Sequence, residues 1–233
     1  SSDLLVVFAQ RRATEDLYDL ARFDLDDALT ASPAPTRLLG RGDNDGVDVD
    51  CTSLRDPAAI ALDGRSSLFV LFTCERQGES SRIGGVRLAR DVTSPTGYRA
   101  IGGDMELLTP ALGAYASQGA SSPELVVTSV GGTRVSFRLW FLARDAEGEV
   151  RVALAYGDID ASGTDAPRLG AYPGNPILSA EAQLLGGPCP GGCAIEALGV
   201  AATEGRSVLW PERFGREPPY VFLVERSVFR ADG

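Results

Sequence analysis

The chain has 233 residues, of which 44% are hydrophobic and 23% charged, so a packed core is feasible and wholesale disorder is not expected. Its net charge of −10 argues against nucleic acids and anionic membrane surfaces as partners, because both are bound through basic surfaces. The chain has neither His nor Lys, which argues against zinc sites, His-based triads and lysine-dependent chemistry. No stretch is long and apolar enough to predict a membrane span.

Apolar runs recur along the chain in a regular order. A run that ends in charged residues appears three times, at 1–12, 66–76 and 137–144. A second type of segment follows each run, at 17–24, 85–91 and 150–158. Short apolar runs bounded by Gly, Pro, Asp and Ser indicate β-strands that are buried on both faces. The period of about 65 residues therefore predicts an array of similar strand units.

Two further strands complete these units. A shorter strand, usually with a Pro, precedes the later runs at 55–62, 121–127 and, more loosely, 195–201. A weak fourth strand follows in two units, at 37–39 and 98–101. Units of about four antiparallel strands are typical of β-propeller blades. We predict one all-β propeller domain over 1–233 with roughly four to five blades, at approximately 1–50, 51–118, 119–186 and 187–233. A β-sandwich with a duplicated sheet is the alternative.

Two parts of the chain depart from the repeat. The first unit lacks its first strand, which either segment 220–226 or a part of the protein outside this chain would supply. We therefore expect a fragment of a ring of about five blades. No signal peptide is evident, so we expect the chain to begin after processing or within a larger protein. Segment 165–192 is rich in Pro, Gly and Ala and is predicted to be a long loop.

The chain has four cysteines, Cys51, Cys74, Cys189 and Cys193. Cys51 and Cys74 flank one predicted strand pair and are placed to join it. Cys189 and Cys193 close a short Gly/Pro loop that suits a local disulfide, although unrelated thiols are the alternative. The even count and the acidic surface favour an oxidising compartment, so we expect an extracellular, periplasmic or cell-surface location.

The motif Asp56-Pro57 opens the best-preserved unit, and an Asp63-Gly64 turn follows its first strand. This order of strand, turn and apolar strand resembles the five-bladed propeller glycoside hydrolases of the arabinanase/xylosidase-like and invertase-like groups. Ser122-Pro123 carries the resemblance less well. The resemblance implies a propeller whose first strands point acidic residues into a central funnel, where carboxylates act on a glycosidic bond.

The resemblance allows two assignments of catalytic residues. In the first, the motif Arg55-Asp56-Pro57 binds sugar hydroxyls, and the acid would fall at Ser121 or Ser122. In the second, Asp56 is the base, Ser122 replaces the middle carboxylate and Glu196 is the acid. Neither assignment gives a complete set of carboxylates, and a neutral Ser does not replace one.

Simpler interpretations exist for the same residues. An Asp before Pro commonly caps a turn, so a structural role is the alternative for Asp56. Glu196 is alternatively a solvated or capping residue. Glu124, which lies close to Ser122 on the same predicted strand, is expected at the surface.

The densest acidic cluster is the segment 43–50. Asp43, Asp45, Asp48 and Asp50 alternate with other residues around Gly46, and this pattern suits a Ca²⁺ loop because the ion takes several oxygen ligands from a tight turn. The Glu that ends an EF-hand loop is absent. The alternatives are a calcium site and a polar turn between blades.

Aromatic residues offer one candidate for stacking on a sugar. Trp210 lies beside Pro and charged residues and is the best exposed candidate. Trp140 and Phe141 lie within an apolar run and are expected in the core.

We therefore expect an exported propeller domain that binds a glycan or protein ligand in its funnel without efficient catalysis. Arg55, Ser122 and Trp210 are the predicted ligand-binding residues. The first alternative is a glycoside hydrolase that uses Asp56 and Glu196. The second is a structural or adhesive module of a larger cell-surface protein. Ca²⁺ is the one cofactor expected, and the oligomeric state stays open.

Overall fold

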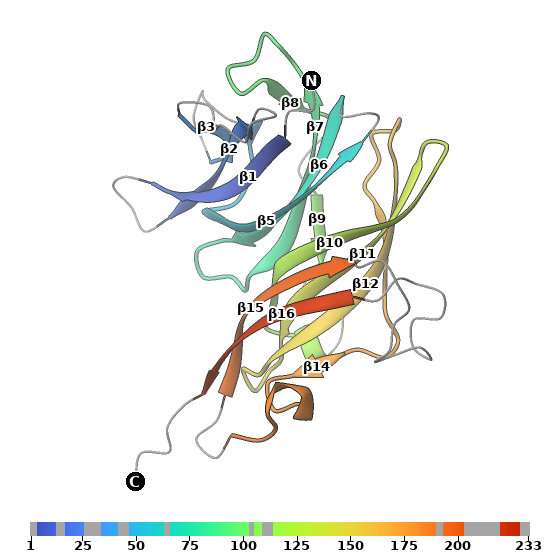
Figure 1. Ribbon diagram of the computed structural model, residues 1–233. Helices are drawn as coiled ribbons and strands as arrows, with labels where there is room; N and C mark the ends of the chain where they lie inside the picture. The colour runs from blue at the N-terminus through green and yellow to red at the C-terminus, as the bar shows by residue number, and fades with distance from the viewer. Residues whose placement is uncertain are drawn as a thin grey trace.

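The computed structural model describes residues 4–12, 17–25, 34–41, 47–62, 66–102, 105–108, 114–189, 193–202 and 220–228. Within these ranges the chain forms four small sheets that follow one another along the sequence (Figure 1). The first sheet contains β1 (Leu4–Arg11), β2 (Tyr18–Leu25), β3 (Thr36–Gly40) and β4 (Val47–Asp48), in that spatial order. Its first three strands are antiparallel, whereas the two-residue β4 pairs in parallel with β3.

The second and third sheets have the same plan. The second contains β5 (Ser53–Leu62), β6 (Ser67–Glu75), β7 (Arg82–Arg90) and β8 (Tyr98–Ala100), and β9 (Met105–Leu108) also pairs with β7. The third contains β10 (Gly119–Gly131), β11 (Arg134–Arg144), β12 (Val150–Asp160) and β13 (Arg168–Ala171), and β14 (Leu178–Ser179) also pairs with β12. All of these pairs are antiparallel, so the predicted order of strands within a unit is confirmed.

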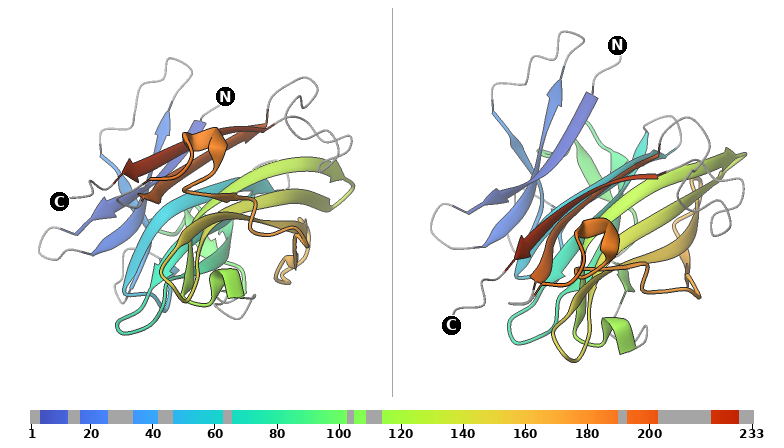
Figure 2. Two further views of the ribbon diagram at one scale, coloured as in Figure 1. Left: turned by 90° about the horizontal axis from the view of Figure 1, so that it is seen from below. Right: turned by 60° about the horizontal axis from the view of Figure 1, so that its bottom comes forward.

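The fourth sheet is the hairpin of β15 (Cys193–Ala202) and β16 (Tyr220–Val228). Both strands lie along the third sheet in Figure 2, and β15 packs against β10, β11 and β12. Because β16 pairs with β15, segment 220–226 does not supply a first strand to the first sheet. Among the described residues, no strand pairs with the outer edge of β1.

The core lies between successive sheets, which explains the continuous apolar runs. Figure 1 shows the second sheet between the first and the third. From β6, Phe69 packs into a cluster shared with the third sheet, whereas Val70 packs into one shared with the first. A third cluster, which includes Trp140 and Ile195, joins the third sheet to the fourth. Burying such a side chain contributes about 1.5–3 kcal/mol, so both faces of a middle sheet need apolar residues.

The prediction of a long loop over 165–192 is wrong in part. This segment contains β13, β14 and a short 3₁₀ helix, η4 (Gln183–Leu185). A second 3₁₀ helix, η3 (Ala114–Ala116), precedes β10. Leu169 pairs with Gly157 and packs against the core, and Leu178 pairs with Val152. Pairing along β12 therefore outweighs the low strand propensity of this Pro- and Gly-rich segment.

Candidate functional site

Three strands, β5, β10 and β15, bulge at matching places. The register with the next strand shifts between Arg55 and Ala58 in β5, between Ser121 and Glu124 in β10, and between Ile195 and Ala197 in β15. The residues inside the bulges are Asp56-Pro57, Ser122-Pro123 and Glu196. The three residues that sequence comparison aligned therefore occupy corresponding backbone positions.

The first two bulges share an unusual backbone conformation. Asp56 and Ser122 both have a φ of 50°, in the left-handed region that costs a residue with a side chain about 1–2 kcal/mol. Each is followed by Pro, which has no N–H to donate to a ladder and is tolerated inside a bulge. Bulges of this kind re-aim side chains and are frequent at functional sites.

Asp56 and Ser122 are joined through Thr73 of β6. The hydroxyl of Thr73 donates to Asp56 Oδ2 at 2.8 Å and accepts a hydrogen bond from the Ser122 backbone N–H at 2.8 Å. Ser122 Oγ also donates to Asp56 Oδ2 at 3.3 Å. Asp56 Oδ1 accepts no hydrogen bond from the described residues, and the Asp56 side chain is exposed. One carboxylate oxygen is thus held in place while the other is open to a ligand.

Sequence reasoning missed Thr73, which is 2% exposed. It is the single polar residue between Leu68 and Cys74, in an otherwise apolar strand. A single hydroxyl in a strand that is buried on both faces needs a hydrogen-bond partner. That requirement is the signal that would have identified Thr73.

Glu124 lies two residues beyond Ser122 on β10, and it is only partly exposed where the sequence predicts a surface residue. It is half-buried on β10, where its partner across the strands is Trp140, which is 0% exposed. Burial, followed by the negative charge of Asp56, raises the pKa of Glu124 from 4.5 to about 7. The Glu124 carboxyl makes no hydrogen bond with the described residues.

The other predicted site residues are not hydrogen-bonded to this group, although Arg55 pairs with Thr73 across the strands. Glu196 is exposed on β15 and makes no hydrogen bond with Asp56 or Ser122. Arg55 forms an ion pair with Glu75, and its guanidinium lies 5.9 Å from the centre of the Tyr18 ring. The Arg55 side chain is thus engaged between the first and second sheets.

The structure places two of the three aromatic residues that the sequence singles out. Trp140 and Phe141 are both fully buried, which confirms their core positions. Trp210 lies outside the described residues, so its role in stacking on a sugar stays a prediction.

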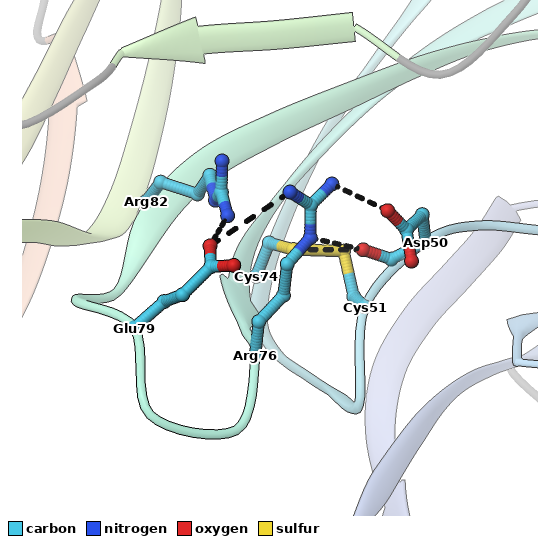
Figure 3. A network of polar contacts seen from close by, with 6 residues as sticks. All are labelled: Asp50, Cys51, Cys74, Arg76, Glu79 and Arg82. Carbon is cyan, nitrogen blue, oxygen red and sulfur yellow. Dashed lines mark hydrogen bonds and ion pairs between the residues drawn. A yellow bond between two sulfur atoms is a disulfide. The ribbon is translucent and has the colours of Figure 1, made fainter.

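The predicted calcium ligands are only partly described. Asp43 and Asp45 lie outside the described residues, as does the side chain of Asp48 in β4. Asp50 is exposed and forms an ion pair with Arg76 at 3.0 Å (Figure 3). The described part of the chain holds no group of three or more side chains of the metal-binding types. A calcium site at 43–50 therefore stays a prediction.

One of the two predicted disulfides is present. Cys51 and Cys74 are bonded, and Figure 3 shows this bond beside a network in which Arg76 contacts Asp50 and Glu79. Since Cys51 lies in the segment between β4 and β5, the bond ties this segment to β6.

The second predicted bridge is wrong, because Cys189 and Cys193 are not disulfide-bonded. The Cys189 thiol is buried and donates to the carbonyl of Gly187 at 3.8 Å, while Cys193 is the first residue of β15 and pairs with Val228. The short spacing suited a bridge, but neither of these contacts joins the two sulfur atoms.

A surface cavity of about 490 Å³ lies elsewhere on the third sheet. Its lining includes Glu149, Arg151 and Glu181. Arg151 forms an ion pair with Asp145 at 3.0 Å, so its charge is already compensated. None of the bulge residues lines this cavity.

No protein-family model matches the chain, and no curated protein is similar to it in sequence. Among solved structures, a thermostable family-43 glycoside hydrolase aligns over 99% of this chain and 69% of its own length, with a TM-score of 0.57 and 13% identity. A GH43_1 enzyme from Xanthomonas citri aligns over 52% of this chain, with a TM-score of 0.36 and 17% identity, too low to carry an argument. The chain spans 32% of that second enzyme. With its successive small sheets, the protein therefore has the β-propeller fold of the family-43 glycoside hydrolases, as the sequence predicts.

Proposed function

We propose that this protein binds a carbohydrate at the bulges of β5 and β10, with Asp56 as the main acceptor of sugar hydroxyls. The observation that carries the proposal is the fixed Asp56 carboxylate, which has one oxygen bound by Thr73 and Ser122 and the other open. The likeness to a family-43 glycoside hydrolase supports a sugar as the ligand class.

We propose binding without efficient hydrolysis because the bulge of β10 presents Ser122, a neutral residue. A hydroxyl neither carries charge nor donates a proton at useful rates near neutral pH. A pair of carboxyl groups across the glycosidic bond is what hydrolysis requires.

Titration of the full chain with neutral xylo- and arabino-oligosaccharides by calorimetry tests the proposal. We expect measurable binding that Asp56→Asn weakens about tenfold, since a hydrogen bond to a charged group contributes about 1.5 kcal/mol. Asp91→Asn, in the turn after β7, is the matched control and should leave affinity unchanged. Absence of binding to every sugar in the panel would refute the proposal.

Hydrolysis by Asp56 and Glu196 is the second candidate, and the bulge that Glu196 occupies in β15 favours it. Under this alternative the protein would hydrolyse aryl glycosides, and Glu196→Gln would abolish the activity. Glu225→Gln, an exposed change on the neighbouring strand, is the control. Activity that survives Glu196→Gln would exclude Glu196 as the acid.

We also propose that the protein works outside the cytoplasm. The Cys51–Cys74 bond supports an oxidising compartment. No helix in the described ranges is long and apolar enough to cross a membrane. Mass measurement of protein isolated from its native source, before and after reduction, tests whether the bond exists there; two free thiols would contradict the proposal.

A further inference from the structure

Arg87 is a charged side chain inside the interface between the second and third sheets. It lies on β7, where it pairs with Phe69 of β6, and side chains at paired positions point to the same face of a sheet. Phe69 packs into the cluster shared with the third sheet, so Arg87 faces that sheet as well. Only 1% of Arg87 is exposed to solvent. Because an arginine keeps its proton in proteins, a positive charge is buried here.

The protein gives the Arg87 guanidinium a single acceptor. Arg87 Nη2 donates to the carbonyl of Ala161, which directly follows β12 of the third sheet. The Nε and Nη1 atoms are buried and have no hydrogen-bond partner among the described residues. A buried donor without an acceptor carries a desolvation cost, and the cost is larger for a charged group. The buried guanidinium therefore requires a further acceptor.

The two carboxylates at the end of β12 are engaged elsewhere. Asp160 is exposed, and its Oδ1 accepts hydrogen bonds from the backbone N–H and the hydroxyl of Ser162. Asp158 forms an ion pair with Arg134 at 3.5 Å. In the part of the chain that the structure describes, neither carboxylate forms an ion pair with Arg87. Burial lowers the pKa of Arg87 more than the charge of Asp160 raises it, so the positive charge is not fully compensated.

The third sheet stabilises a guanidinium at the matching place in a different way. Arg138 of β11 pairs with Tyr156 of β12, as Phe69 pairs with Arg87 in the second sheet. The Arg138 guanidinium lies 4.3 Å from the centre of the Tyr156 ring, and the face of a ring attracts a cation. Among the described residues, no ring is stacked on Arg87 in this way. Arg87 therefore lacks the stabilisation that Arg138 has.

We propose that Arg87 forms a binding site for a small inorganic anion, with chloride as the ligand, between the second and third sheets. A chloride ion accepts hydrogen bonds and also supplies the negative charge that Arg87 lacks. The buried position favours a monatomic anion, because a larger anion has to displace apolar side chains of the cluster that contains Phe69. The bound anion stabilises the contact between β7 and the turn that follows β12. This inference does not depend on the proposed carbohydrate function.

The melting temperature of the full chain across a series of chloride concentrations tests the proposal. Sodium methanesulfonate keeps the ionic strength constant, because its anion is too large for the buried position. The melting temperature should rise by about 3–5 °C for every tenfold increase in chloride above its dissociation constant, since binding to the folded state stabilises it by mass action. A melting temperature that does not change across the series would overturn the proposal.

Two variants separate binding at Arg87 from a general effect of salt. Arg87→Met removes the charge and keeps an apolar side chain, so its melting temperature should not respond to chloride. Without chloride this variant should melt at or above the wild-type temperature, because it no longer buries an uncompensated charge. Arg90→Met, exposed at the end of β7, is the matched control and should respond as the wild type does. Equal chloride responses in Arg87→Met and the wild type would overturn the proposal.

Anomalous diffraction from wild-type crystals grown in bromide locates the anion and keeps the inference testable if Arg87→Met fails to fold. We expect a bromide ion in contact with Arg87 Nε or Nη1. Bromide bound at other places alone, an adventitious ion only, would overturn the proposal. A water molecule or a carboxylate of the protein at these two nitrogens would overturn it as well. None of these outcomes changes the sugar titration, so the two proposals fail separately.

Discussion

In the second sheet, the bulge of β5 presents Asp56, and Thr73 of β6 pairs with Arg55 at the start of that bulge. In the third sheet, the bulge of β10 presents Ser122, and Leu142 of β11 pairs with Ser121 at the matching place. The two backbones match closely, with a Pro after each bulge residue and a φ of 50° at both. The third sheet has no hydroxyl at the place of Thr73, and its carboxyl group lies on Glu124 instead. The comparison teaches that one backbone geometry can present different chemistry in neighbouring blades.

Of the features that differ between the two sheets, the disulfide should contribute most to stability. Cys74 of β6 is bonded to Cys51, whereas the matching position of β11 is Ala143. Removing the bond with Cys51→Ser and Cys74→Ser should lower the free energy of unfolding by about 3 kcal/mol, as expected for a loop of this length. Urea unfolding measures the loss. Reduced wild type should show the same loss, and equal stability of all three samples would contradict the prediction.

Thr73 should come next in effect. Thr73→Val removes the donor to Asp56 and leaves the Ser122 N–H without its acceptor, which should cost about 2 kcal/mol. Thr73→Ser keeps the hydroxyl and is the matched control. If the Val variant unfolds at the same urea concentration as the Ser variant, the hydroxyl does not join the two sheets.

Glu124 should give a pH-dependent effect of on the order of 1 kcal/mol, reduced by its partial exposure to solvent. Its pKa is raised on folding, so the folded state binds more protons, and stability falls as pH rises from 4.5 to about 7. Glu124→Gln removes this penalty and should be more stable than the wild type above about pH 7. Unfolding of both proteins across this range checks the sign; a constant difference would contradict it.

The smallest effects should come from Asp91 and Asp160, which occupy matching turns after β7 and β12. Side-chain and backbone hydrogen bonds from Thr93 lower the pKa of Asp91, and those from Ser162 lower the pKa of Asp160. A lowered pKa stabilises the fold above the unfolded pKa, and this is lost as pH falls through the folded value. At neutral pH, Asp91→Asn and Asp160→Asn should each have a melting temperature slightly below that of the wild type. In acid, all three proteins should melt at the same temperature. A wild type that melts at the same temperature as both variants at neutral pH would contradict this.

Most of the strand order could be predicted, because a continuous apolar run indicates a strand whose sheet is covered on both faces. Phe69 and Val70 are adjacent in sequence and enter different clusters, so a continuous run such as β6 has a physical cause. The short strands β13 and β14 could not be predicted, because their formation depends on pairing with β12.

The Pro-containing motif predicted the bulge residues of the candidate site. It did not predict the side chains that surround them. Two Pro-containing strands identified Asp56 and Ser122 as equivalent, and the structure brings them into contact. Glu124 follows the bulge, and a bulge shifts the alternation of side chains, so counting residues does not tell which face it occupies. Thr73 lies on a different strand, and only the packing of β10 against β6 places it beside Ser122.

The Thr73 hydroxyl bonds to both the second and the third sheet, so the site links the positions of two blades. Any sliding of the third sheet along the second would change both of its hydrogen bonds and the approach of Ser122 to Asp56. If a ligand binds at Asp56 as proposed, it would resist that sliding, and by thermodynamic linkage an alignment of blades that favours these bonds would also favour the ligand. Ligand binding at Asp56 and resistance of the two sheets to sliding would then be linked by one coupling free energy.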